Sequence, residues 1–537
     1  MRPIHALFPR LALRTLLILA AAPCALAAPP MQATPAPPLP AIDDALFPFA
    51  EADVASLQAL MAAHELDSST LTQAYLQRIA LMDRRGPRLH AVIELNPDAH
   101  KEAVARDRER RAGRVRGPLH GIPVLVKDNI DARPMSTTAG SLALAGYRPD
   151  DAFLVRRLRA AGAVILGKTN LSEWANYRGT GSVSGWSARG GQTRNPYRRS
   201  HSPCGSSSGS AVAMSANLAA VAIGTETDGS IVCPAAMNGV VGLKPTVGLV
   251  SRDGIVPISF SQDTAGPITR TVADAALVLT AIAGRDDADP ATATMPGRAV
   301  YDYTARLDPA GLRGARIGVL DEPLSRQAGI GSLMERAIDE LQRAGATVVR
   351  VPALDDNSWN DDEQTVLRFE FKAGLERYLQ RGKAPMRTLA QVIAFNRDHA
   401  RDELPLFGQE LLEAAATAGP LGDAGYIQAR SRARRMAGEQ GIDARLREHR
   451  LDALVAPTTG LAWRIDTPGG DAFPGGNYSA AAVAGYPSLS VPMGHVDGLP
   501  VGLLFMGTAW SEPRLIELAY AYEQRTMARR PPPDDTR

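Results

Sequence analysis

The sequence predicts an α/β fold in which helices sandwich a large, mostly parallel mixed central sheet. Short apolar runs, typical of buried strands, alternate along the chain with segments whose apolar residues recur at three- and four-residue spacing, as on one face of a helix. The 537 residues, 45% of them hydrophobic and 22% charged, can form a large core. Strands and helices that alternate in this way favour parallel strands joined by helical crossovers.

The individual elements follow from the same patterns. The first helices are expected at residues 56–63 and 70–82. Asp150 and Asp151 are expected to cap a helix that ends at Ala161. Strands are expected at residues 124–126, 163–166, 219–224, 317–320, 347–351, 451–455, 489–491 and 501–505, and further helices at 209–218 and 333–341.

The start of the chain has the features of an export signal. Arginines precede an apolar stretch, and Ala25 to Ala27 fit a small-residue cleavage site. We therefore expect a signal peptide at residues 1–27, a periplasmic or secreted mature protein, and no stable membrane insertion after cleavage. Lipid attachment at Cys24 is an open alternative, although Pro23 before it fits that alternative poorly.

The mature chain is expected to consist of a proline-rich leader and one large domain. The leader covers residues 28–45, and the domain covers residues 46–537, because no internal repeat and no clean linker divides it. A mainly helical insertion is expected at about residues 357–450. Nothing in the sequence specifies an oligomer, and a monomer is expected.

Charge and cysteine content exclude several classes of function. The net charge is +2, from 59 basic and 57 acidic residues, which gives no electrostatic case for binding nucleic acid or an anionic membrane. No Cys/His spacing indicates a metal site, and no cofactor is expected. After signal cleavage Cys204 and Cys233 remain. Two buried free thiols are the favoured interpretation, although a bridge between them is geometrically conceivable.

Two motifs in the chain match well-known patterns in the wrong context. Residues 162–169 match the phosphate-loop pattern G-x-x-x-x-G-K-[ST], but its variable positions form an apolar strand, which cannot curl around phosphates. Ser207 is the centre of a G-x-S-x-G nucleophile-elbow pattern. That motif requires a strand directly before it, and residues 194–203 read as a loop. The glycine- and serine-rich stretch at residues 179–210 could also be a linker, but it contains aromatic residues and continues into a helix.

Three residues at junctions between strands, turns and helices suggest a catalytic site. Ser206 lies in a Gly/Ser-rich turn, Ser230 follows Gly229, and Lys127 follows the apolar strand at residues 124–126. Such junctions place functional groups at the edge of a sheet. Together they suggest a hydrolase whose serine nucleophile is activated by a lysine.

The same residues resemble the amidase signature family. The resemblance rests on residues 205–211, on Gly229 and Ser230 twenty-four positions after Ser206, and on Lys127 after residues 121–123. It extends to residues 167–173, 239–246, 263–267 and 484–492, and therefore covers most of the mature chain. Residues 224–234 are especially similar to bacterial peptide amidases, which remove the C-terminal amide from peptides. Cys204 departs from the glycine that is usual in the family, a change that peptide amidases share.

The resemblance implies a role for each site residue. Ser230 is the nucleophile, Ser206 is in a cis peptide bond and bridges Ser230 to Lys127, and Lys127 is the general base. The backbone N–H groups around Thr227, Asp228, Gly229 and Ser230 form the oxyanion hole. The implied reaction is hydrolysis of a carboxamide through an acyl-enzyme with release of ammonia, and the implied substrate is the C-terminal amide of a peptide or a small amide. Two alternatives stay open: a broad aryl or aliphatic amidase, and an inactive amidase-like binding subunit.

The chemistry places a physical requirement on Lys127. Its amine can accept a proton only when it is neutral, so its pKa must fall by about 3 units from its ordinary value, a cost of about 4 kcal/mol. Burial behind the apolar strand lowers the pKa, whereas an adjacent carboxylate would raise it. Asp128 is therefore expected to point away from the amine. Lys168, Lys244, Asp263 and the side chain of Asp228 are expected to have structural or supporting roles.

Overall fold

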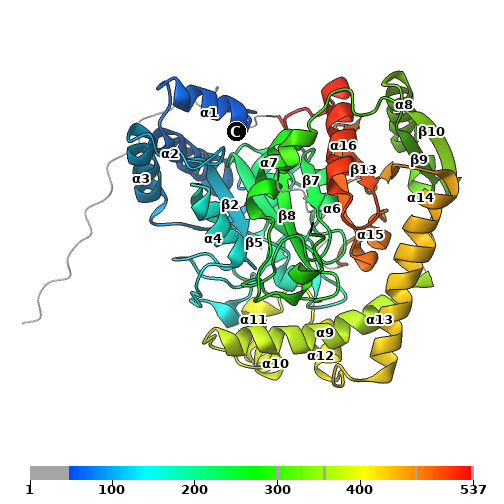
Figure 1. The fold of residues 1–537 in the computed structure, drawn as a ribbon. Helices are drawn as coiled ribbons and strands as arrows, with labels where there is room; N and C mark the ends of the chain where they lie inside the picture. Colours follow the sequence, from blue (N-terminus) through cyan, green and yellow to red (C-terminus); the bar gives the residue numbers. More distant parts are fainter. Residues whose placement is uncertain (1–46, 298–301, 328, 355–357, 466–468, 534–537) are drawn as a thin grey trace, which may run out of the picture. The chain divides into compact units, whose positions relative to one another are not determined.

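A mixed sheet of 11 strands forms the centre of the fold (Figure 1). The computed structural model describes residues 47–297, 302–327, 329–354, 358–465 and 469–533. The strand order is β1-β3-β2-β6-β8-β7-β12-β13-β11-β9-β10. The strands are β1 (Val92–Leu95), β2 (Pro123–Lys127), β3 (Val164–Thr169), β6 (Val221–Glu226), β7 (Val241–Lys244), β8 (Thr264–Thr269), β9 (Arg316–Asp321), β10 (Thr347–Pro352), β11 (Ala453–Pro457), β12 (Ser488–Val496) and β13 (Leu499–Met506). A separate pair is formed by β4 (Trp186–Ser187) and β5 (Gly191–Gln192).

The expected mixed α/β sheet is confirmed, with less parallel pairing than the sequence suggested. Parallel pairs occur in two groups, β3-β2-β6 and β11-β9-β10. The strands between these groups pair antiparallel. Strands β1, β7 and β8 were not identified from the sequence. In β8, Gly266 and Pro267 have the composition of a turn. A Cβ atom at Gly266 would lie 2.0 Å from the carbonyl oxygen of Leu243, so this strand requires glycine for close approach to β7.

Helices contact the sheet where their apolar residues repeat at helical spacing. In α8 the buried residues are Ile330, Leu333, Met334, Ala337, Ile338 and Leu341, which all lie on one face. The helices outside the insertion are α1 (Val54–Ala62), α2 (Ser68–Arg78), α3 (Ala99–Arg111), α4 (Phe153–Ala160), α5 (Ser208–Ser215), α6 (Val232–Met237), α7 (Val272–Ile282), α8 (Ile330–Arg343), α15 (Ser479–Ala484) and α16 (Glu512–Thr526). A π-helical segment, Ile79–Arg85, continues α2, and short 3₁₀ turns connect other elements.

The expected aspartate cap of α4 is wrong. The N-cap residue is Ala152, and no side chain caps this helix. The carboxylate of Asp151 instead accepts hydrogen bonds from the backbone N–H of Arg133 and from the guanidinium of Arg159. Asp150 forms an ion pair with Arg133. The two aspartates therefore bind arginines near the helix, and the local sequence does not reveal these partners.

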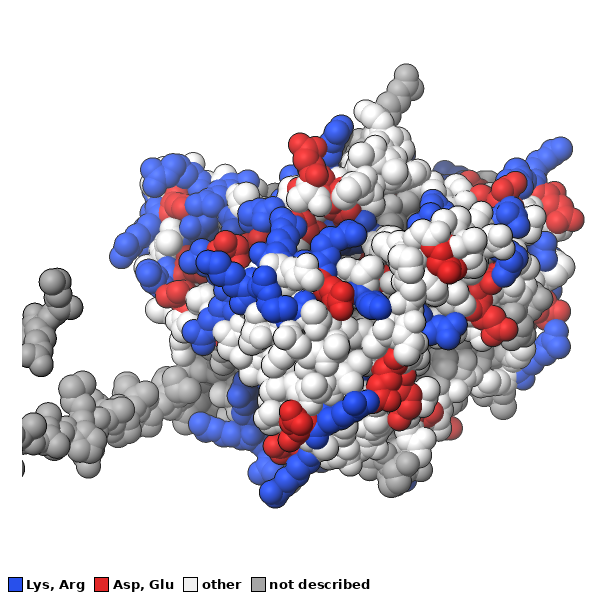
Figure 2. All heavy atoms as spheres, turned by 90° about the horizontal axis from the view of Figure 1, so that it is seen from below, with Lys and Arg blue, Asp and Glu red and all other residues white. Residues whose placement is uncertain are grey.

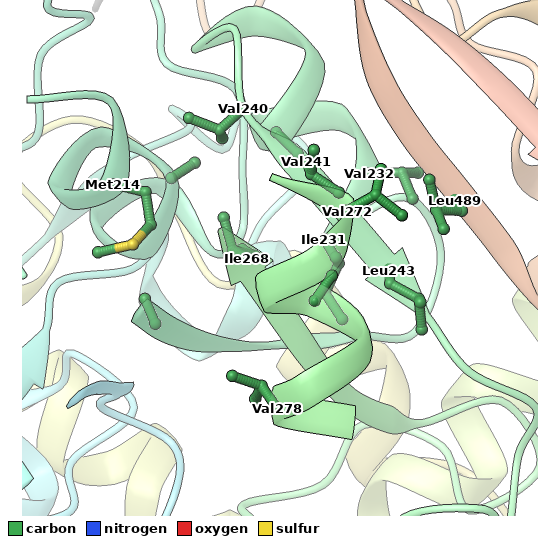
Figure 3. Packing of buried hydrophobic residues seen from close by; sticks show 14 of the residues in the cluster. Met214, Ile231, Val232, Val240, Val241, Leu243, Ile268, Val272, Val278 and Leu489 are labelled. Atoms are coloured by element: carbon green, nitrogen blue, oxygen red, sulfur yellow. The ribbon is translucent and has the colours of Figure 1, made fainter. Parts of the chain in front are cut away.

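Apolar side chains of β7, β8 and neighbouring elements pack together in one hydrophobic core (Figure 3). The labelled side chains in this view are Met214, Ile231, Val232, Val240, Val241, Leu243, Ile268, Val272, Val278 and Leu489. Ile231 and Val232, which directly follow Ser230, are fully buried among them. The packing therefore fixes the start of α6 and, with it, the backbone at Ser230.

The segment between β10 and β11 is mainly helical, as Figure 1 shows. It contains α9 (Asn360–Arg381), α10 (Leu389–Asp398), α11 (Ala400–Glu403), α12 (Glu410–Ala416), α13 (Ala424–Ala437), a π-helical segment (Gly438–Ile442) and α14 (Asp443–His449). Two arginine-rich helices, α3 and α13, interleave basic with acidic or small residues. Figure 2 shows basic and acidic side chains interspersed on the face seen from below, with Lys and Arg denser on the left.

The N-terminal features expected from the sequence, at residues 1–27 and 28–45, lie outside the described residues. The described residues all belong to one compact unit, Ala45–Arg537. None of the helices within the described ranges is long and apolar enough to cross a bilayer.

Candidate active site

Two parallel neighbouring strands bring the candidate residues to one edge of the sheet. Strands β2 and β6 pair in register from Val124 opposite Val221 to Val126 opposite Ile223. Lys127 is the last residue of β2, and the turn of residues 227–230 follows the end of β6. Because the carboxyl ends of parallel strands lie at the same edge, the lysine and the turn meet there.

The amine of Lys127 is buried and surrounded by hydroxyl and carbonyl oxygens. Its Nζ atom lies 2.8 Å from the Oγ atom of Ser206, 2.9 Å from the Oγ1 atom of Thr225 and 3.2 Å from the carbonyl oxygen of Thr225. Burial lowers the pKa of Lys127 from 10.5 to about 7, although the charges of Glu226 and Asp263 act in the opposite direction. The pKa shift required for a neutral amine is therefore present.

Asp128 points away from this amine, as expected. Its carboxylate accepts a hydrogen bond from the hydroxyl of Thr138 and lies 3.3 Å from the Nζ atom of Lys168. Lys168 also donates to the carbonyl oxygen of Ser136 at 3.0 Å. Lys168 therefore neutralises Asp128 in the interior and leaves Lys127 without a directly bonded carboxylate.

Ser206 lies in the turn that leads into α5, and the peptide bond between Gly205 and Ser206 is cis. Its side chain is fully buried and contacts Lys127. Its carbonyl oxygen accepts the backbone N–H of Ser172 at 3.1 Å. The backbone that follows the cis bond is therefore held by a neighbouring segment, and the hydroxyl of Ser206 lies beside the amine.

Ser230 lies at the end of the 227–230 turn, directly before α6. Its side chain is 7% exposed, and its carbonyl oxygen accepts the backbone N–H of Ser207 at 3.1 Å. This bond joins the segment of Ser206 to the segment of Ser230. Gly229 has a φ of +76°, and a Cβ atom there would lie 2.1 Å from the ring of Tyr478. The turn therefore requires glycine for both its conformation and its packing.

Polar side chains hold the other residues of the 227–230 turn. The hydroxyl of Thr227 donates to Asp263 at 2.6 Å, and burial raises the pKa of Asp263 to about 6. The carbonyl oxygen of Thr227 accepts a hydrogen bond from the Nε2 atom of Gln262 at 3.3 Å. The side chain of Asp228 hydrogen-bonds to Glu363 of α9. The side chains of Thr227 and Asp228 therefore both have protein partners.

Sequence reasoning missed several residues of this site. Thr225 accepts hydrogen bonds from the amine of Lys127 at its carbonyl oxygen and its Oγ1 atom. The Oγ1 atom also accepts a hydrogen bond from the side-chain amide of Asn129 at 2.9 Å. Gln262 and Glu363 contact the 227–230 turn from distant parts of the chain. Thr225 was close in sequence to the glycine turn, and that proximity was a usable signal. Glu363 lies in the helical insertion, where no local pattern indicated a role.

The structure gives neither the phosphate-loop pattern nor the nucleophile-elbow pattern the context that its function requires. Gly167, Lys168 and Thr169 belong to β3 itself, so no phosphate-binding loop follows that strand. Ser207 is fully buried, and its hydroxyl donates to the carbonyl oxygen of Thr225 at 3.0 Å. Residues 194–203 contain only an isolated bridge at His201, not the strand of a nucleophile elbow.

The favoured interpretation of two free thiols is wrong, because Cys204 and Cys233 form a disulfide. Their Cα atoms are 6.0 Å apart, within the usual range for a bridge. Cys204 lies two residues before Ser206, and Cys233 lies three residues after Ser230. The 29-residue separation concealed this proximity, which arises only when the two serine segments fold against each other.

A large cavity of about 1130 Å³ lies between segments of the sheet region and helix α9 of the insertion. Asp263 lines it and links it to the 227–230 turn through Thr227. Gly374 and Tyr378 of α9 also line it. Lys127, Ser206 and residues 227–230 are not among its lining residues, so this cavity does not enclose the three side chains.

Comparison with known proteins identifies the family to which the chain belongs. Residues 70–516 match the protein-family model described as Amidase. The chain is a member of the amidase signature family. This amidase places a lysine, a cis-peptide serine and a second serine at one sheet edge.

Solved and curated relatives cover nearly the whole amidase. The X-ray structure of native peptide amidase from Stenotrophomonas maltophilia has 74% sequence identity and a TM-score of 0.89, and the match covers 91% of this chain and 100% of that chain. A peptide amidase in complex with the competitive inhibitor chymostatin has 75% identity and a TM-score of 0.90, over 90% and 99% of the two chains. A protein from Arabidopsis thaliana named "probable amidase" is 43% identical over 502 residues, which cover 90% of this chain and 92% of that protein. The protein is thus an enzyme that hydrolyses amide C–N bonds.

Proposed function

We propose that the amidase removes the C-terminal amide of peptides and releases ammonia, with Ser230 as nucleophile, Ser206 as proton relay and Lys127 as general base. The observation that carries this proposal is the 2.8 Å contact between Lys127 and Ser206, two fully buried side chains. The substrate class is supported by the similarity to peptide amidases at 74 and 75% identity.

The first half of the reaction forms an acyl-enzyme. As the Oγ atom of Ser230 bonds to the amide carbon, its proton passes to Ser206, and the proton of Ser206 passes to the neutral amine of Lys127. The carbonyl oxygen becomes an oxyanion, which backbone N–H groups of the 227–230 turn stabilise. The C–N bond then breaks, and the nitrogen takes a proton from Lys127 through Ser206 to leave as ammonia.

The second half regenerates the enzyme. A water molecule gives a proton to Lys127 through Ser206 and bonds to the acyl carbon. The Ser230 C–O bond breaks, Ser230 regains a proton, and the peptide leaves with a C-terminal carboxyl group. The net reaction consumes one water and produces one carboxylic acid and one ammonia. A hydroxyl can donate and accept a hydrogen bond at once, which suits Ser206 to both halves.

Ammonia release from a short peptide amide tests the proposal. We expect release by the wild type and its loss in Ser230→Ala and Lys127→Ala. Ser215→Ala is the matched control, because it removes another buried serine hydroxyl, in α5, outside the site. Faster turnover of aryl or small aliphatic amides than of every peptide amide would support the broad-amidase alternative. No release from any amide by the folded wild type would support a binding subunit.

We also propose that the protein acts as an exported monomer. The features of residues 1–27 support export, and so does the Cys204–Cys233 disulfide, because such bonds persist in oxidising compartments. N-terminal sequencing of protein from a periplasmic fraction is expected to begin at Ala28. A mature N-terminus at Met1 would contradict export, and a dimer mass in size-exclusion chromatography with light scattering would contradict the monomer.

A further inference from the structure

Helix α9 of the insertion presents two buried carboxyl groups toward the active site. Glu363 is 5% exposed and Glu370 is 0% exposed. They are seven residues apart, so they lie on one face of the helix, about two turns from each other. Buried carboxyl groups are costly unless polar partners satisfy them, so their partners indicate what they do.

Glu370 anchors the loop before β8 to α9. Its carboxylate accepts the hydroxyl of Ser259 at 2.6 Å, the backbone N–H of Ser261 at 2.8 Å and the hydroxyl of Tyr426 at 2.7 Å. The loop continues directly into Gln262 and Asp263, the two residues that hold Thr227. Glu370 therefore fixes the base from which this pair reaches the 227–230 turn.

Glu363 reaches the turn itself by two routes. The Nε2 atom of Gln262 donates one hydrogen bond to the Oε1 atom of Glu363 at 2.8 Å and another to the carbonyl oxygen of Thr227 at 3.3 Å. The carboxyl group of Glu363 also hydrogen-bonds to the side chain of Asp228. Burial raises the pKa of Glu363. The higher pKa favours the protonated form of Glu363, which can donate a hydrogen bond to the carboxylate of Asp228.

We propose that Glu363 is a positioning residue that holds the 227–230 turn in its reactive geometry through Gln262 and Asp228. This inference rests on the role proposed above for Ser230. Glu363 is assigned no contact with the substrate and no part in proton transfer to the leaving group. Through Glu363, the helical insertion supports a site whose proposed reacting side chains, Lys127, Ser206 and Ser230, lie outside the insertion.

Small displacements of such a turn are expected to affect the rate more than binding. Backbone donors stabilise an oxyanion that exists only in the transition state, and the loss of one donor typically costs about 10²–10³ in rate. A misplacement of about 1 Å can cost about 10². We therefore expect Glu363→Ala to lower kcat by about 10- to 100-fold, with KM within about threefold of wild type.

Substitution at Glu363 separates positioning from a chemical role. In Glu363→Gln the amide oxygen can still accept from Gln262, and the amide nitrogen can donate to the carboxylate of Asp228, so kcat should stay within about threefold of wild type. Asp362→Ala is the matched control, because it removes a carboxylate from the adjacent position of α9, where the partner is Arg432. Its kcat should equal that of wild type.

The measurement is steady-state ammonia release from a peptide amide by the full-length mature protein, with circular dichroism as the folding check. If folded Glu363→Ala keeps the wild-type kcat, or if Glu363→Gln is as slow as Glu363→Ala, the inference is overturned. If Glu363→Ala does not fold, Gln262→Ala decides, since it cuts the same link from the other end and should show the same kcat loss. A wild type without activity, or an active Lys127→Ala, would overturn the proposed function instead.

Discussion

The Nζ atom of Lys127 lies 2.8 Å from the Oγ atom of Ser206, and both side chains are fully buried. This contact joins the end of β2 to the turn before α5, 79 residues away. Burial brings the pKa of Lys127 to about 7, so a neutral amine is available near physiological pH. A hydroxyl beside a neutral amine can pass a proton to it without an intervening histidine.

The rate is expected to depend on the protonation of Lys127. Because only the neutral amine can act as a base and its pKa is about 7, kcat/KM should rise with pH through about 7 and level off above it. Lys127→Arg should be inactive across this range, because a guanidinium stays protonated. Initial rates of ammonia release between pH 5 and 9 check this. A flat profile over that range would contradict the assignment of the base.

The same pKa shift predicts a pH-dependent cost in stability. Above the pKa of the unfolded lysine, 10.5, both states are neutral; as the pH falls toward about 7, the unfolded state gains a proton that the folded state does not bind. Stability should therefore decrease between about pH 10 and 7, by up to about 4 kcal/mol from this residue, and change little from it below that. In Lys127→Met this dependence should disappear. Urea unfolding midpoints of the wild type and of Lys127→Met at pH 7 and 9.5 measure this dependence. The same change in midpoint with pH in both proteins would refute the prediction.

Neighbouring serines should respond differently to removal of their hydroxyls. Ser206→Ala removes the proton relay and should lower kcat by about 10²–10⁴. Ser207→Ala removes two hydrogen bonds to the backbone of Thr225, which should cost about 1–3 kcal/mol of stability while most of the activity remains. Ammonia-release assays and thermal denaturation of the two variants make the comparison. Loss of activity in Ser207→Ala alone would favour the nucleophile-elbow interpretation.

The disulfide is expected to stabilise both the fold and the site. Replacing Cys204 and Cys233 together by serine should lower the free energy of unfolding by about 2–4 kcal/mol. The same change should reduce kcat, because the bridge ties the Ser206 segment to the Ser230 segment. Thermal denaturation and ammonia release measure the two effects. Free-thiol titration of the mature protein, denatured without reductant, is the control: it should find no thiol, and two thiols would show that the bridge is absent.

Much of the site was readable from local sequence, for a physical reason. Lys127 follows an apolar run, and Ser206 and Ser230 lie in glycine-rich turns. Burial and turn formation depend mostly on residues a few positions apart, so these patterns indicated both the strands and the junctions after them. The same patterns left β8 unidentified, where Gly266 and Pro267 belong to a buried strand, and were wrong at α4, where Asp151 binds arginines instead of capping the helix.

What the sequence by itself determined is the set of candidate site residues and the α/β class of the fold. What only the tertiary structure decided is which distant residues support them: the Cys204–Cys233 bridge, and the link from Gln262 to Glu363 across 101 residues. Such contacts form because whole segments pack against each other, and the energy of that packing is spread over many residues rather than encoded in any short stretch. Local patterns therefore predict where a side chain can react, and packing determines how it is held there.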